Sequence, residues 1–137
     1  METLVDLLSI FKKRGKEEVF IYRTGIRRFT FSYLDLYEMS LKMATFLEEK
    51  GIKKGDKVAI WAPNSPYWAV CFFGILLKEG VVIPIDFAGG LEKARNIVSH
   101  SGAKYVIQSY FKFEKKTGIE SVAIEDLIFL LNNKKAV

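Results

Sequence analysis

The chain has 137 residues, 50% hydrophobic and 27% charged, a composition that suits one globular domain and argues against a disordered chain. Its formal charge of +5 comes from lysines and arginines spread along the sequence without interleaved aromatic residues, so we interpret them as a solvated surface and not as a nucleic-acid interface. The single cysteine, Cys71, excludes a disulfide framework and fits a reducing compartment.

No targeting or membrane segment is expected. The N-terminal stretch carries acidic Glu2 and Asp6 ahead of its basic cluster, and its apolar positions are interrupted, unlike those of a signal peptide. The longest apolar run, from Tyr67 to Leu77, has eleven residues, whereas a membrane-spanning helix needs about 20. We therefore expect a cytoplasmic protein with no transmembrane segment.

The first predicted elements are a helix and a hairpin. Residues 3–13 have the spacing of an amphipathic helix. Residues 18–24 and 26–31 are both typical of strands, and Gly25 between them marks a turn. This arrangement predicts an antiparallel β-hairpin.

A long helix is predicted to follow the hairpin and to continue to Lys50. Either Thr30 or Ser32 caps it, and if Ser32 is the cap, Asp35 completes an approximate capping box. Gly51 is expected in the left-handed conformation that ends helices. Water-facing residues occupy only one narrow stripe, so we expect this helix to be covered on more than one side. The stripe consists of Asp35, Glu38, Lys42, Thr45 and Glu49.

From residue 57 onward, strand patterns alternate with helix patterns. The strand segments are short and apolar, as is typical of strands buried on both faces of a parallel sheet. A β-α-β-α-β order implies parallel strands joined by right-handed crossovers. Pro84 cannot donate a backbone hydrogen bond and places its strand near a sheet edge or strand end. The predicted strands are 57–61, 81–85 and 104–108, and the predicted helices are 65–78 and 91–101.

The two helices of this unit differ in polarity. Residues 91–101 have a single apolar face, whereas residues 65–78, with Ser65 as N-cap and Pro66 at the first position, are apolar all round. A helix that is apolar all round must be buried all round. A unit of this size has few other residues with which to bury both this helix and the helix that ends at Lys50. We therefore expect the chain to be part of a larger body.

Residues 109–137 form a boundary region with weaker patterns. We interpret residues 111–117 as a polar loop, residues 122–124 as a short strand and residues 125–131 as helical, with a charged tail.

The loop after the first parallel strand is the place where a dinucleotide fold would hold phosphate. Here the loop runs from Ala62 to Pro66 and has no glycine, and neither GxGxxG nor GxxxxGK followed by Ser or Thr occurs in the chain. The first N–H groups of the next helix could still hold an anion. Because Pro66 lacks an N–H, we favour a satisfied helix cap over a phosphate site.

The remaining reactive residue types have structural explanations. Asp86 ends a strand without a second carboxylate or histidine nearby in sequence, which favours a turn or helix-cap role over a ligand site. His100, the only histidine, has no metal or triad partner in sequence reach. Cys71 is interpreted as a small buried hydrophobe. The aromatic residues Trp61, Trp68, Phe72 and Phe73 are interpreted as core.

Three stretches occur in an ordered set across residues 18–108. They are VFIYRTGIRRFTFSYLDL, then FLEEKGIKKGDKVAIWAPNSPYWAVCFFGILLKEGVVIPID, then ARNIVSHSGAKYVI. As a set they resemble the AMP-forming acyl-CoA synthetases and their relatives, which include luciferases and the adenylation domains of peptide synthetases. The resemblance implies an α/β fold in which a β-hairpin and helix precede a β-α-β-α-β parallel-sheet unit, as part of the large N-terminal domain of adenylate-forming enzymes. It also favours Thr30 over Ser32 as the helix cap.

The resemblance implies that residues 1–137 are a single N-terminal subdomain of a longer enzyme. The family's phosphate loop, ATP-ribose aspartate, hinge and C-terminal catalytic lysine have no counterpart in these residues, so no catalytic, cofactor-binding or metal-binding residue is assigned to this chain. The parent enzyme would use ATP, Mg²⁺ and coenzyme A to convert a fatty acid to acyl-CoA, releasing AMP and pyrophosphate. The implied partners are the rest of the parent polypeptide and a fatty-acid substrate, not nucleic acid. Alone, the chain is expected to be inactive and to self-associate.

Two other functions stay open on the sequence. One is a complete small α/β binding module without enzymatic activity. The other is a basic domain that binds nucleic acid or a membrane surface, which would show a steep salt dependence of DNA binding.

Overall fold

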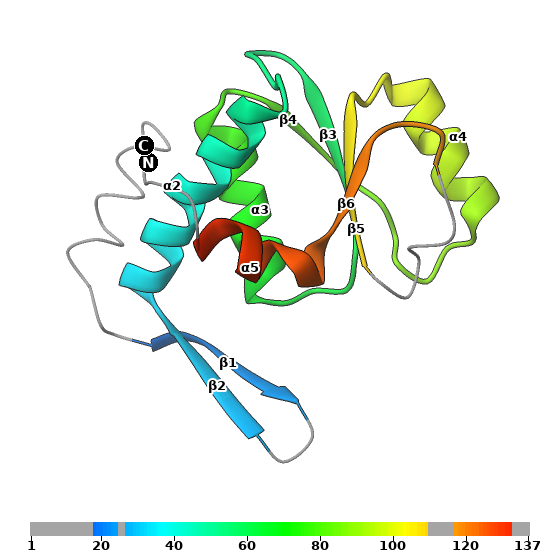
Figure 1. Cartoon of the computed structure of the whole chain (residues 1–137). Coiled ribbons are helices and arrows are strands. Elements are labelled where there is room, and N and C mark those ends of the chain that lie inside the picture. Colours follow the sequence, from blue (N-terminus) through cyan, green and yellow to red (C-terminus); the bar gives the residue numbers. More distant parts are fainter. Residues whose placement is uncertain (1–17, 25–26, 110–116, 133–137) are drawn as a thin grey trace.

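A four-stranded parallel sheet with helices on both faces forms the body of the chain (Figure 1). The structure is a computed structural model that describes residues 18–24, 27–109 and 117–132. The strand order is β4-β3-β5-β6, and every neighbouring pair is parallel, which confirms the predicted parallel unit. The strands are β3 (Lys57–Trp61), β4 (Val81–Pro84), β5 (Tyr105–Gln108) and β6 (Ser121–Ala123).

Two helices connect the first three of these strands and cover opposite faces of the sheet (Figure 1). α3 (Pro66–Leu77) joins β3 to β4, and α4 (Leu91–Ser101) joins β4 to β5. Because side chains alternate along a strand, β3, β4 and β5 each contribute to both cores. This two-sided burial explains why these strands are mostly apolar. The α3 face holds Val58, Ile60 and Ile107, and the α4 face holds Ala59, Trp61 and Val106.

β4 is an edge strand, as Pro84 predicts. The backbone N–H groups of Val81 and Ile85 donate toward β3, to the carbonyl oxygens of Asp56 at 2.8 Å and Ile60 at 3.0 Å. In a strand, alternate residues direct their backbone groups to opposite sides, so Pro84 faces the open edge. Its missing N–H removes a donor from that edge and discourages pairing with a further strand.

The N-terminal hairpin is separate from the main sheet. β1 (Glu18–Thr24) and β2 (Arg27–Ser32) pair antiparallel, with Tyr22 opposite Phe29 and an irregular register between Glu18 and Phe20. This confirms the predicted hairpin. Figure 1 shows it projecting away from the body at the start of α2.

The long helix α2 (Tyr33–Glu49) begins at Ser32. The Ser32 Oγ accepts a hydrogen bond from the Asp35 N–H at 3.0 Å, and the Asp35 Oδ2 accepts one from the Ser32 N–H at 3.0 Å. This reciprocal pair is a complete capping box. Capping at Thr30, which the family resemblance favours, is wrong, because the backbone of Thr30 is paired with Ile21 in the hairpin.

The end of α2 follows the predicted glycine stop. Gly51 has φ 81° and donates its N–H to the Glu48 carbonyl at 3.0 Å. The Ile52 N–H reaches the Leu47 carbonyl at 3.0 Å, and the Ile52 side chain is buried. Together these contacts form a Schellman motif, which satisfies carbonyls that a helix end leaves open.

α2 and α3 pack closely through a glycine. A Cβ added to Gly74 would lie 2.5 Å from Met43 Cγ and 2.7 Å from Met43 Cβ. Helix backbones can approach this closely only where one of them lacks a side chain. Gly74 therefore sets the distance between the two helices.

The C-terminal part of the chain adds β6 and a short helical segment beside α2. The predicted strand at residues 122–124 corresponds to β6. The predicted helix at 125–131 corresponds to a 3₁₀ turn (Ile124–Asp126) followed by α5 (Leu127–Asn132). The predicted helix at 3–13, and the predicted loop at 111–117 except for Thr117, lie outside the described residues.

Candidate functional site

A shallow hollow lies at the carboxyl ends of the neighbouring strands β3 and β4. In open parallel sheets, ligands bind in the crevice outside this edge. The hollow has a volume of about 260 Å³ and lies between the loop after β3 and the loop after β4. It is lined by Ala62, Pro63, Asn64, Trp68, Pro84, Ile85, Asp86 and Phe87.

The β3–α3 loop forms one side of this hollow and is arranged as a helix cap. The Ser65 Oγ accepts from the Trp68 N–H at 3.3 Å, and the Ser65 carbonyl accepts from the same N–H at 3.1 Å. Pro66 is buried at the first helical position and has no N–H to offer. The predicted cap is confirmed. Its geometry differs from a phosphate cradle, in which successive glycine N–H groups face the ligand.

Asp86 forms the other side of the hollow and acts as a turn residue. Its Oδ1 accepts from the Ala88 N–H at 3.1 Å, and its carbonyl accepts from the Gly89 N–H at 3.1 Å. These bonds confirm the predicted turn role. Asp86 does not cap α4, because the N-cap of α4 is Gly90.

Cys71 and His100 lie apart from the hollow and hold structural positions. Cys71 is fully buried in the core on the α3 face, and burial raises the pKa of its thiol far above the usual range. A thiol that stays protonated is a poor nucleophile. His100 is exposed on the last turn of α4, where its Nδ1 lies 2.7 Å from the Asn96 carbonyl oxygen and donates to it when protonated. Both observations agree with the sequence-based interpretation.

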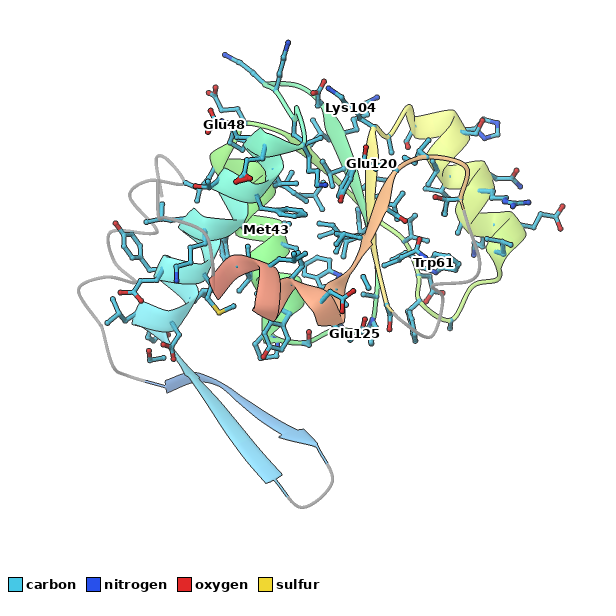
Figure 2. The ribbon with its side chains drawn as sticks, in the orientation of Figure 1. Met43, Glu48, Trp61, Lys104, Glu120 and Glu125 are labelled. Atoms are coloured by element: carbon cyan, nitrogen blue, oxygen red, sulfur yellow. The ribbon has the colours of Figure 1, made fainter. Side chains whose placement is uncertain are left out.

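A buried polar contact that the sequence did not indicate lies at the end of β5. The Ser109 Oγ donates to the Glu125 Oε2 at 2.5 Å, and Ser109 is fully buried. Figure 2 labels Glu125 on the turn that precedes α5. The Ser109 N–H also donates to the Trp61 carbonyl at 3.2 Å. These contacts attach the 3₁₀ turn of Glu125 to the carboxyl edge of β5. Because the partners are 16 residues apart in the sequence, no local pattern indicates the contact.

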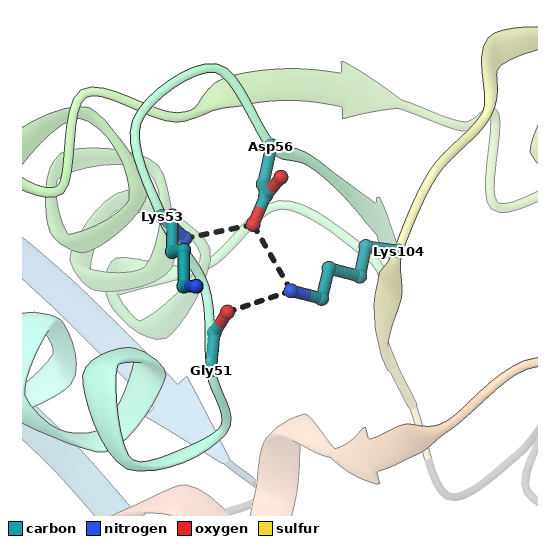
Figure 3. Close-up of polar contacts among 4 residues, drawn as sticks. All are labelled: Gly51, Lys53, Asp56 and Lys104. Atoms are coloured by element: carbon teal, nitrogen blue, oxygen red, sulfur yellow. Dashed lines mark hydrogen bonds and ion pairs between the residues drawn. The ribbon is translucent and has the colours of Figure 1, made fainter.

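A second polar network lies at the opposite end of the sheet, where the strands begin (Figure 3). The Lys104 Nζ donates to the Gly51 carbonyl at 2.7 Å and contacts the Asp56 Oδ2 at 3.2 Å. The same carboxylate accepts from the Lys53 N–H at 2.7 Å. The Lys53 N–H, followed by the Lys104 ammonium, lowers the pKa of Asp56. The network ties the end of α2 to the starts of β3 and β5, so its role is architectural.

Two further properties of the described residues concern metal binding and membrane insertion. Within residues 18–24, 27–109 and 117–132, no three His, Cys, Asp or Glu side chains are grouped so that they could hold a metal ion. In the same ranges, no helix combines the length and the apolar content that a membrane crossing requires. The described residues therefore provide the carboxyl ends of buried strands and a hollow with one carboxylate, that of Asp86, in its lining.

Comparison with known proteins gives one consistent family. The model of a family described as AMP-binding enzyme matches residues 10–133. The crotonobetaine/carnitine–CoA ligase of Proteus mirabilis is 35% identical over 79 residues, which are 58% of this chain and 15% of that protein. The long-chain-fatty-acid–CoA ligase of Bacillus subtilis is 26% identical over 133 residues, which are 97% of this chain and 23% of that protein. The chain thus spans less than a quarter of either relative.

The fold has the same affiliation. The solved N-terminal domain of FACL13 from Mycobacterium tuberculosis superposes on the whole of this chain with a TM-score of 0.86 at 22% identity. The chain covers 38% of that structure. Its fold is therefore that of a portion of the N-terminal domain of adenylate-forming enzymes, as the sequence resemblance implied.

Proposed function

The chain belongs to the AMP-binding enzyme family, and from this membership we propose that residues 1–137 are one scaffold subdomain of an ATP-dependent acyl-CoA synthetase. The parent reaction would join a fatty acid to coenzyme A and convert ATP to AMP and pyrophosphate. The observation that carries the proposal is the family match over residues 10–133, which includes both crossover units of the sheet.

The contribution of this chain is positional. Val58, Ala59, Ile60 and Trp61 of the central strand β3 are all fully buried, so the strand that ends at the hollow is held rigidly. Groups mounted on rigid elements keep their geometry better than groups on loops. We propose that the sheet edge supports catalytic motifs that come from sequence other than these 137 residues.

ATP and Mg²⁺ would be held by those other motifs. The described residues do not fit a triphosphate, because the β3–α3 loop lacks glycine and its Ser65 is engaged as a cap. They do not fit a metal either, since Asp86 is the only carboxylate lining the hollow and it accepts a turn hydrogen bond. No reaction step is therefore assigned to a residue of this chain, and alone it is inactive.

A fatty acid is the substrate class that we propose, with support from the extent of one alignment. The long-chain-fatty-acid–CoA ligase aligns with 97% of the chain, whereas the crotonobetaine/carnitine–CoA ligase aligns with 58%. The lone buried Cys71 suits a reducing compartment, so we place the protein in the cytoplasm. The half-buried apolar residues of α3 favour self-association of the isolated chain at high concentration.

A chimera tests the proposal. The segment of the Bacillus subtilis ligase that aligns with this chain is replaced by residues 1–137, and fatty-acid-dependent ATP–pyrophosphate exchange is measured. We expect exchange above that of the ligase from which the segment has been deleted. A chimera that unfolds cooperatively but shows no exchange with any fatty acid, beside an active unmodified ligase, would overturn the proposal.

A further inference from the structure

The hollow at the carboxyl ends of β3 and β4 lies where two neighbouring loops leave the sheet in opposite directions. The loop after β3 leads to α3 on one face, and the loop after β4 leads to α4 on the other face (Figure 1). Such a divergence opens a crevice between the loops, and open α/β sheets bind their ligands in crevices of this kind. The topology therefore favours a ligand site here, independently of the residues that line the hollow.

The lining of the hollow combines aromatic rings with one carboxylate. Trp68 comes from α3 and Phe87 from the loop after β4, and both are half-buried, whereas Asp86 is exposed. Two prolines of the lining add apolar surface. Trp68 stacks on Phe72 with ring centroids 5.7 Å apart and planes 16° apart, and this contact holds the indole in place. The hollow thus presents aromatic and apolar surface beside a negative charge.

Asp86 is fixed by its own turn and keeps acceptor capacity for a ligand. Its Oδ1 accepts from the Ala88 N–H at 3.1 Å, and its carbonyl accepts from the Gly89 N–H at 3.1 Å. An ionised carboxylate has about four acceptor positions on its two oxygens. In the described part of the chain this carboxylate forms no ion pair, and no lysine or arginine is among the described residues of the lining. The hollow is therefore locally negative in a chain whose formal charge is +5.

The chemistry of the lining selects an organic cation over other ligands. A carboxylate or phosphate would be repelled by Asp86 without a compensating cation. A purely apolar group would cover the charge of Asp86 without pairing it. An alkylated ammonium suits both parts of the lining, because the carboxylate and the aromatic rings attract its charge while its alkyl groups contact the apolar surface.

We propose that the hollow binds a quaternary ammonium head group of a small molecule, with Trp68 and Phe87 as the aromatic contacts and Asp86 as the counter-charge. The volume of about 260 Å³ is smaller than that of pockets for drug-sized ligands, which is about 300–1,000 Å³. The hollow therefore holds a head group and leaves the rest of the ligand in solvent. The inference goes beyond the proposed function and does not depend on it, because the chain's own residues form the site.

A nuclear magnetic resonance titration of the isotope-labelled chain tests the proposal. The probe is choline, and its control is the neutral analogue in which carbon replaces the nitrogen, because the two have the same shape and differ in charge. We expect choline to shift the indole N–H signal of Trp68 saturably, with a Kd in the millimolar range. The neutral analogue should give no saturable shift.

Three variants identify the groups that bind the cation. Asp86→Asn keeps an oxygen for the Ala88 N–H but removes the charge, and Phe87→Leu keeps apolar volume but removes the ring. Each should raise the Kd for choline by at least about threefold. Glu120→Gln is the matched control, because it removes the same charge from an exposed side chain just before β6, at the opposite end of the sheet. It should leave the Kd unchanged, and circular dichroism verifies that all three variants stay folded.

Several outcomes would overturn the proposal. One is the absence of a saturable shift up to about 100 mM choline. Another is equally tight binding of choline and its neutral analogue, which would show that apolar contact alone is responsible. A third is an equal loss of binding in Asp86→Asn and Glu120→Gln, which would indicate a general effect of charge. Each of these results would leave the proposed function standing, and an inactive chimera would leave the ammonium site standing.

Discussion

The close approach of α2 and α3 at Gly74 leads to a specific stability prediction. In Gly74→Ala, the new methyl group would lie 2.5 Å from Met43 Cγ and 2.7 Å from Met43 Cβ, whereas carbon atoms pack at about 3.5–4.0 Å. A change of rotamer moves Met43 Cγ, but Met43 Cβ is fixed to the α2 backbone. The helices must therefore separate by roughly 1 Å.

The size of the effect follows from two opposing terms. Overpacking that side-chain rotation cannot relieve costs about 3 kcal/mol, the upper part of the usual range. Replacing a helical glycine with alanine returns about 1 kcal/mol. We expect a net loss of about 2 kcal/mol in the free energy of unfolding, measured from urea titrations, and a Tm lower by roughly 8 °C.

Two further variants make this prediction specific. Gly90 has φ −78° and open space around its Cβ position, so Gly90→Ala should cost less than about 1 kcal/mol, the ordinary loss at an N-cap. In a Met43→Gly background, Gly74→Ala should cost less than in the wild type, because the Cγ and Cβ contacts are both gone. A Gly74→Ala chain as stable as the wild type would refute the reasoning that Gly74 sets the helix spacing.

The other predictions concern four single side chains. Ser32→Ala should lose about 1 kcal/mol of stability, because the helix cap is lost. Ser40→Ala should gain about 1 kcal/mol, because the buried Ser40 hydroxyl has no hydrogen-bond partner among the described residues and alanine is the better helix former. Urea titrations that give both changes the same sign would contradict this expectation. The folded-state pKa of Asp56 is lowered, so its stabilising contribution is present above the unfolded pKa of about 3.9 and is lost as the pH falls through the folded value. Denaturation midpoints of the wild type and Asp56→Asn should therefore differ at neutral pH and converge in acid, and a gap that stays constant with pH would count against the network of Figure 3. Cys71, buried and with a raised thiol pKa, should react with iodoacetamide only as fast as the chain unfolds, and labelling as rapid as that of free cysteine would show that the core is open.

Local patterns in the sequence were sufficient for most of the fold. Among the described residues, the predicted strands and helices agree with the structure to within about two residues, because caps, glycines and apolar runs specify where each element begins and ends. The β4 boundary illustrates this precision: the predicted strand ends at Ile85 and the observed one at Pro84, yet the Ile85 N–H still donates to the Ile60 carbonyl. The Ser32 cap shows that the local sequence can be more informative than the family pattern. Asp35 lies three residues after Ser32 and can complete a capping box with Ser32 but not with Thr30.

Contacts between distant residues could not be predicted in the same way. Lys104 is 48 residues from Asp56, and Ser109 is 16 residues from Glu125. Each pair meets only because parallel strands align their ends at one edge of the sheet. The contact between Gly74 and Met43 is similar, since nothing in the apolar sequence of α3 indicates that its glycine will face Met43 of α2. The two polar pairings depend on the order of the strands in the sheet. The sequence predicted that the strands are parallel, but it did not predict their order.

The central claim is that these residues support chemistry performed elsewhere, and ATP–pyrophosphate exchange by the 137-residue chain alone tests it most directly. The assay contains ATP, Mg²⁺, labelled pyrophosphate and fatty acids of several lengths, and it follows activity across the chain's elution profile. We expect no exchange above a protein-free control with a fatty acid of any length. Exchange that depends on a fatty acid and co-elutes with the chain would contradict it, because a catalytic group would then have to lie within these 137 residues.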